Sequence, residues 1–120
     1  MSNIDSKEVE RISYEIKMAG DIEHAKRVIK NHVTNDLRSC VTLSSTSFIY
    51  PGGVEEGFIV RFENYPRFPV EYEYTIEQRA VTLLKILMNE LCETSAMLCS
   101  KEKAKWFFDR RFRSGQEDFT

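Results

Sequence analysis

The sequence has few residues that form disulfide bridges or metal sites. Its three cysteines, Cys40, Cys92 and Cys99, are odd in number and lack C-x-x-C spacing, which argues against a disulfide framework and a thiolate metal site. Its two histidines, His24 and His32, do not have the i, i+4 spacing of a helical zinc-binding pair. We therefore expect neither a metal ion nor a cofactor.

Long apolar runs are also missing. No stretch approaches the roughly 18 apolar residues that a membrane-spanning helix requires, and the first residues contain no apolar signal-peptide core. We therefore expect a cytoplasmic protein without a membrane partner. Its 120 residues, of which 42% are hydrophobic and 12% aromatic, match a single domain over residues 1–120, with residues 114–120 as a flexible tail.

The spacing of apolar residues predicts two helices in the first third of the chain. Val9, Ile12 and Ile16 recur at helical spacing after a predicted cap at Asp5, and Gly20 offers a stop. A second helix is predicted over residues 21–35. Its apolar face is formed by Ile22, Ala25, Val28, Ile29 and Val33.

Residues 40–62 have the features of two strands joined by a tight turn. In the first strand Thr46, Phe48 and Tyr50 alternate with their neighbours, and the Pro-Gly-Gly of residues 51–53 then turns the chain. In the second strand, residues 57–62, Phe58 and Val60 share one face, as an antiparallel hairpin requires. The prolines within residues 64–69 end this strand, because proline has no amide donor.

Helical spacing is longest in the second half of the chain. A capping box at Thr75 and Gln78 precedes an apolar stripe of more than four turns. The stripe consists of Ile76, Ala80, Leu83, Leu84, Leu87, Met88 and Leu91. Residues 95–100 and 104–111 predict two further strands, although an amphipathic helix over residues 103–113 fits the same sequence. The predicted order, α-α-β-β-α-β-β, is an α+β fold with a single antiparallel sheet and helices packed on one face.

Residues 101–113 combine clustered cations with aromatic rings. They carry six cations and two acids, a charge of +4 within a chain whose net charge is −2. Arg110, Arg111 and Arg113 are candidate phosphate contacts, because guanidinium groups bond phosphate oxygens in bidentate fashion. Trp106 or Phe112 would stack on a base. A solvated, charged edge strand explains the same cations without a ligand.

Residues 64–69 form a second candidate segment. Tyr65 and Arg67 flank Pro66, and Pro69 follows, so the backbone that carries Arg67 is restrained before any ligand binds. Ligand contact by Tyr65 and Arg67 is one interpretation of this segment. Packing against the edge of the sheet is the other.

Charge and missing motifs limit the expected function. A net charge of −2 and a pI near 5.7 disfavour a long nucleic acid as partner, so a small nucleotide is the expected ligand. The sequence contains neither a G-x-S-x-G elbow nor a P-loop, and we therefore expect a protein that is not an enzyme. Exposed strands favour a homo-oligomer.

Three segments resemble small proteins of phages and prophages: residues 40–42 (Cys-Val-Thr), 48–53 (Phe-Ile-Tyr-Pro-Gly-Gly) and 64–69 (Asn-Tyr-Pro-Arg-Phe-Pro). In size and in its arginine-rich, aromatic C-terminus, the chain is also similar to phage anti-defence sponge proteins. Among these is the Thoeris anti-defence family, which sequesters cyclic ADP-ribose isomers made by TIR proteins. None of that family's ligand residues is assigned to a position in this chain.

The resemblance implies a non-enzymatic phage protein that binds and sequesters a small nucleotide immune signal in the host cytoplasm. The signal would be a cyclic ADP-ribose isomer or a cyclic nucleotide. Two alternatives stay open. One is a protein inhibitor that docks on a host enzyme through a sheet edge or residues 65–69, and the other is a small protein that processes nucleic acids or nucleotides.

Overall fold

The computed structural model of the chain describes residues 3–35, 40–64 and 73–111. Within these residues the chain forms five strands and two helices. In chain order they are β1 (Ser13–Ala19), α1 (Ile22–Asn35), β2 (Val41–Tyr50), β3 (Gly53–Glu63), α2 (Glu73–Glu90), β4 (Ser95–Cys99) and β5 (Ala104–Phe108). The strands form one sheet in the order β2-β3-β1-β4-β5, and each neighbouring pair is antiparallel.

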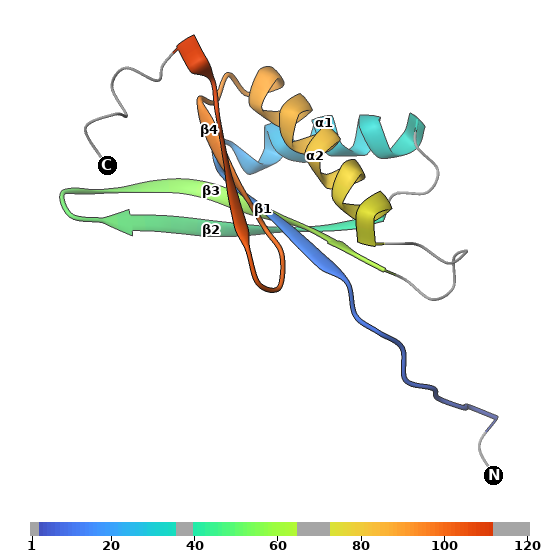
Figure 1. Ribbon diagram of the computed structural model, residues 1–120. Helices are drawn as coiled ribbons and strands as arrows, with labels where there is room; N and C mark the ends of the chain where they lie inside the picture. The colour runs from blue at the N-terminus through green and yellow to red at the C-terminus, as the bar shows by residue number, and fades with distance from the viewer. Residues whose placement is uncertain (1–2, 36–39, 65–72, 112–120) are drawn as a thin grey trace.

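The first six elements have the β-α-β-β-α-β order of a ferredoxin-like fold, and β5 adds a strand beside β4. Figure 1 shows α1 and α2 on the same side of the sheet. The predicted fold class is thus confirmed: the protein is α+β, with one antiparallel sheet and helices packed on one face. We call the other side of the sheet, which neither helix covers, the open face.

The first element is a strand, where the spacing of apolar residues predicted a helix. Tyr14, Ile16 and Met18 are buried and alternate with half-buried neighbours along β1. This strand lies in the middle of the sheet and pairs with β3 on one side and β4 on the other. Two ladders of backbone hydrogen bonds and a buried face outweigh a weak local helical spacing. From the second element on, the order is as predicted.

Two smaller expectations are also wrong. The helix α2 begins at Glu73, two residues before Thr75, so Thr75 is not its cap. The strand β5 ends at Phe108 rather than at residue 111, and the strand over residues 104–108 excludes the alternative helix there. The amide of Asp109 then donates to the carbonyl of Thr94, which closes the β4–β5 pair.

The core lies between the helices and the sheet. From α2, Leu83, Leu84 and Leu87 are fully buried, and they face the buried sides of the central strands. The sheet contributes Tyr14, Ile16, Met18, Phe58, Val60, Phe62, Ala96 and Leu98. Burying an aliphatic or aromatic side chain of this size contributes about 1.5–3 kcal/mol, so this layer dominates the stability of the fold.

β2 and β3 continue beyond the rest of the sheet. Because β1 ends at Ala19, opposite Gly57, residues 47–56 pair with each other and with no third strand of the described sheet. We call residues 47–56 the arm. Figure 1 shows its turn pointing away from both helices. Its side chains include Ile49 and Val54, which are 81% and 57% exposed. No helix of the described part of the chain is long and apolar enough to cross a membrane.

Candidate functional site

A cavity of about 440 Å³ opens at one end of the sheet, where the start of β1, the β4–β5 turn and the N-terminal part of α2 meet. Three charged or polar side chains from these three elements converge there. Tyr14 comes from β1, Glu77 from α2 and Lys105 from β5. Residues far apart in the sequence therefore form one polar cluster, which we call the Glu77 site.

The Glu77 carboxylate is held from both sides. The Lys105 Nζ donates to Oε1 at 2.9 Å, and the Tyr14 hydroxyl donates to Oε2 at 3.0 Å. The hydrogen bond from Lys105, and then that from Tyr14, lowers the pKa of Glu77. The carboxylate is therefore ionised at neutral pH. Because the Tyr14 side chain is buried, it also fixes the carboxylate relative to the core.

The cavity contains charges of both signs. Its cations are Arg11, Lys101, Lys103 and Lys105, and its acids are Glu10, Glu77 and Glu102. Such a lining suits a small ligand that itself carries both signs, because each ligand charge can find an opposite partner. An amino-acid group, with one carboxylate and one ammonium, has this property.

A second polar cluster lies on the open face. Arg61 of β3 makes a short, charge-assisted pair with Glu15 of β1 through Nη2, and its Nε donates to the same carboxylate at 2.8 Å. The hydrogen bond and charge of Glu15 raise the pKa of Arg61. Glu63 lies 3.9 Å from Arg61 and 3.3 Å from Arg11. The Arg61–Glu15 pair cross-links β1 and β3 at directly opposed positions, which is a structural role.

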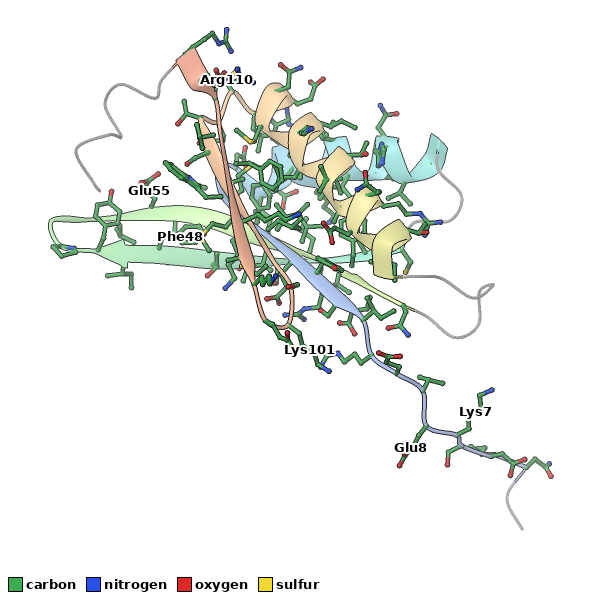
Figure 2. All side chains as sticks on the ribbon, viewed as in Figure 1. Lys7, Glu8, Phe48, Glu55, Lys101 and Arg110 are labelled. Atoms are coloured by element: carbon green, nitrogen blue, oxygen red, sulfur yellow. The ribbon has the colours of Figure 1, made fainter. Side chains whose placement is uncertain are left out.

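The cations of residues 101–113 do not form one patch. Lys101 and Lys103 precede β5 and line the cavity, whereas Arg110 and Arg111 follow the strand at its other end. Figure 2 shows Lys101 and Arg110 at opposite ends of this hairpin. A cluster in the sequence is therefore divided in space, because an extended strand separates its two halves by about 3.3 Å per residue.

Arg111 is engaged by a neighbour. Its Nη2 lies 2.6 Å from Asp109 Oδ2, and its Nε and backbone amide also donate to that carboxylate. These contacts lower the pKa of Asp109 to about 2. The Arg111 side chain is 82% exposed, so a ligand could reach it but would compete with Asp109. Arg110 is exposed.

Trp106 lies on the open face and not in the cavity. It is 52% exposed, and its ring centroid is 4.6 Å from that of Phe108, with the rings tilted by 38°. Lys105 and Trp106 point to opposite faces because neighbouring residues of a strand alternate. The remaining predicted contacts lie outside the described residues: Tyr65, Arg67, Phe112 and Arg113. In the described ranges, no group of three or more His, Cys, Asp or Glu side chains could hold a metal ion.

No protein-family model matches the chain, and no curated protein matches it. Two solved structures match over most of its length. Phage SAM lyase in the apo state matches 82% of this chain and 90% of that chain. Phage SAM lyase in complex with S-methyl-5'-thioadenosine matches 92% of this chain and 99% of that chain. Both have a TM-score of 0.57 and 10% sequence identity, so the likeness concerns the fold.

A third structure is the periplasmic divalent cation tolerance protein CutA from Archaeoglobus fulgidus. It is 14% identical, with a TM-score of 0.46, and the match covers 91% of this chain and 97% of that chain. The resemblance to phage proteins seen in the sequence is matched by the similar fold of the two phage SAM lyase structures. Its narrower part, the Thoeris anti-defence family, stays a prediction.

The expectation that the chain is not an enzyme is contradicted by these matches, because the two structures with TM-scores above 0.5 are those of a lyase. That expectation rested on missing nucleophile and phosphate-binding motifs. Such motifs belong to particular enzyme classes, and a site built from single residues on separate strands and helices leaves no motif.

Proposed function

We propose that the chain is a phage enzyme that binds a small nucleoside-bearing molecule in the Glu77 site and converts it. The proposal rests on one observation: an ionised carboxylate, anchored by Tyr14 and Lys105, lies in a cavity of about 440 Å³ that also carries several cations. The fold supports it, because a phage SAM lyase solved in complex with S-methyl-5'-thioadenosine has a similar fold.

S-adenosylmethionine is the first candidate substrate. Its amino-acid end carries one carboxylate and one ammonium, which match the cations and acids of the cavity, and its sulfonium adds a further positive charge. In our proposal Lys101 or Lys103 pairs with the substrate carboxylate, while Glu77 faces the ammonium or the sulfonium. Tyr14 and Lys105 hold Glu77 in place.

The reaction would break the bond between the sulfonium sulfur and the amino-acid side chain, and the electron pair would remain on sulfur. S-methyl-5'-thioadenosine, a neutral thioether, leaves. The amino-acid fragment balances the reaction either by losing a proton or by attack of its own carboxylate, in which case no proton is exchanged. Analysis of the second product distinguishes the two routes.

The experiment compares three proteins incubated with S-adenosylmethionine, heated and analysed by mass spectrometry. Wild type should release S-methyl-5'-thioadenosine. Glu77→Gln should release at least about tenfold less, with a nearly unchanged melting temperature, because it removes the charge and keeps the shape. The matched control is Glu90→Gln, an exposed change at the other end of α2, which should behave like wild type.

Two results would contradict this proposal. Recovery of intact S-adenosylmethionine in one-to-one amount would mean binding without conversion. If neither S-methyl-5'-thioadenosine nor bound S-adenosylmethionine were found, the Glu77 site would not take this substrate. A parallel incubation with cyclic nucleotides and ADP-ribose isomers tests the immune signals that the resemblance implies, here as substrates.

A second ligand mode is favoured by the exposure of Arg110, Arg111 and Trp106. In this mode, Arg110, Arg111 and Arg113 contact the phosphates of a nucleotide, and Trp106 stacks on its base. The first mode uses Glu77 and the lysines of the cavity, whereas the second uses Trp106 on the open face and the arginines after β5, so the two modes are separable by mutation. We also propose that copies of the chain associate with one another and act in the host cytoplasm.

A further inference from the structure

The two edges of the sheet are protected very differently. The edge strand β5 has five residues, includes Lys105 and directly follows Lys103. The edge strand β2 has ten residues and contains no charged residue and no proline. A long, uncharged edge exposes a row of unpaired amides and carbonyls, and monomeric proteins usually block such edges with charges, prolines or bulges.

An apolar groove runs beside this unprotected edge, between α1 and the first residues of β2. Its volume is about 490 Å³. The charged residues along it are Glu23, Lys26 and Lys30 of α1, all exposed, so its lining carries a net positive charge. Its apolar walls are Ile22, Ile29 and Val33 from α1 and Val41 and Leu43 from β2. An occupant should therefore be apolar at its centre and acidic beside α1.

The arm presents a surface with these properties. Ile49 and Val54 are directly opposed in the β2–β3 pair and are 81% and 57% exposed. The next pair on the same face is Ser47 and Glu56, and the Ser47 hydroxyl donates to the Glu56 carboxylate at 2.9 Å. By strand alternation this face continues that of Leu43, which is the side of the sheet that carries the helices.

We propose that a second copy of the chain pairs its β2 with this edge, antiparallel, about a two-fold axis at Ser45. In this register Ser45 faces Ser45 of the partner subunit, and Val41 faces Ile49 of the partner subunit. Opposed residues in an antiparallel pair point to the same face, so the apolar pair of each arm lies at the mouth of the other copy's groove. Glu56 of the partner subunit then approaches Lys26 and Lys30.

The partner is a second copy because the features on the two sides match each other. An uncharged strand does not repel its own copy, whereas like charges placed directly opposite one another would. A two-fold axis uses the groove, the lysines and the arm twice, so a single surface is both donor and acceptor of the contact. This interface rests on the proposed self-association and is independent of the ligand.

A cysteine placed on the axis tests the register. In a background with Cys40→Ser, Cys92→Ser and Cys99→Ser, Ser45→Cys should form a disulfide-linked dimer on mild oxidation. Opposed Cα atoms of an antiparallel pair lie about 4.5–5.5 Å apart, within the range of a disulfide. The matched control, Ser47→Cys in the same background, should not link, because it would face Leu43 of the partner subunit.

A second variant keeps the test independent of the cysteine background. Ile49→Lys should shift the light-scattering mass from twice 14.1 kDa toward 14.1 kDa at micromolar concentration, whereas Val9→Lys, also at an exposed apolar position, should not. An oligomer in which Ser45→Cys fails to link and Ile49→Lys has no effect would overturn this interface and leave self-association standing. A wild-type monomer would overturn both.

Discussion

The two halves of β3 have the same alternation and opposite surroundings. In the half beside β1, Phe58, Val60 and Phe62 are at most 4% exposed, because the helices cover them. In the half that belongs to the arm, Val54 occupies the same face and is 57% exposed. Alternation therefore identifies which residues share a face but not whether another element covers that face. On the arm this face is exposed, and in our proposal a second copy of the chain contacts it.

The first prediction sharpens this difference with Leu87→Ala. Leu87 of α2 is fully buried in the core beneath the helices, so the truncation should lower the free energy of unfolding by about 2–5 kcal/mol at any protein concentration. Ile49→Ala on the arm should cost less than about 0.5 kcal/mol in dilute protein and more as the concentration rises. Urea titrations at two concentrations measure both. A concentration-dependent loss for Leu87→Ala would remove the distinction.

Gly57 marks the boundary between the two halves, and Gly57→Ala is the second prediction. An added Cβ would meet the Met18 carbonyl, the Phe48 ring at 2.6 Å and the Ala19 Cα at 2.9 Å. Because two of these are backbone contacts, the strands must shift, at a cost of about 1–3 kcal/mol. Gly52→Ala is the control: it has open space and a φ of +91°, so its cost of about 1 kcal/mol is conformational. Equal losses of unfolding free energy for Gly57→Ala and Gly52→Ala, measured by thermal unfolding, would contradict a steric role for the close approach at Gly57.

The buried and exposed parts of the fold also show what the sequence could and could not predict. The spacing of Leu83, Leu84 and Leu87 and the alternation of Phe58 and Val60 correctly located α2, the second half of β3 and the core, because both patterns are uninterrupted there. β3 begins at Gly53, four residues before the predicted strand. β1 was missed because its short alternation overlaps with a helical spacing, and its strand conformation depends on partners far along the chain.

The candidate site was harder to predict than the fold. Tyr14, Glu77 and Lys105 have no common motif. The pairing of β1 with β4 and of β4 with β5, and the packing of α2 on β1 and β4, bring them together. The basic segment, in contrast, was visible in the sequence, yet β5 divides it. A charge cluster in the sequence remains a cluster in space on a helix or in a loop, and not necessarily along a strand.

The third prediction concerns the hydrogen bond by which Tyr14 of β1 holds the Glu77 carboxylate. Tyr14→Phe removes a part-buried hydrogen bond and should cost about 0.5–1.5 kcal/mol. Because the folded-state pKa of Glu77 is lowered from 4.5, its contribution is complete above the unfolded-state pKa and is lost as the pH falls through the folded-state pKa. The difference between wild type and Tyr14→Phe should therefore narrow in acid. A difference that is constant from pH 7 to pH 3 would separate Tyr14 from the ionisation of Glu77.

The smallest effect on stability is expected from the arginines beyond β5. Arg110→Glu and Arg111→Glu should each change stability by no more than about 0.5 kcal/mol, because both side chains are exposed and surface changes have little effect. Arg113→Glu completes the set for the binding measurement. If they contact ligand phosphates, nucleotide binding should weaken by at least about tenfold, which corresponds to 1.4 kcal/mol. Calorimetry of each variant with cyclic nucleotides measures this. Wild-type affinity in all three variants would show that these cations only keep the edge strand solvated. Ligand binding would then depend on the Glu77 site, and Lys105→Glu should weaken it.

The central position of β1 has a consequence for the order of folding. The β2–β3 hairpin closes over a two-residue turn, so the arm can form as soon as its own residues are available. β1 must instead wait for distant segments, since Ser13 pairs opposite Glu63 and Glu15 opposite Cys99. Loop closure over such separations is slow. The chain should therefore expose its uncharged β2 edge before its core is complete, and early capture of that edge by a second copy would protect it from aggregation.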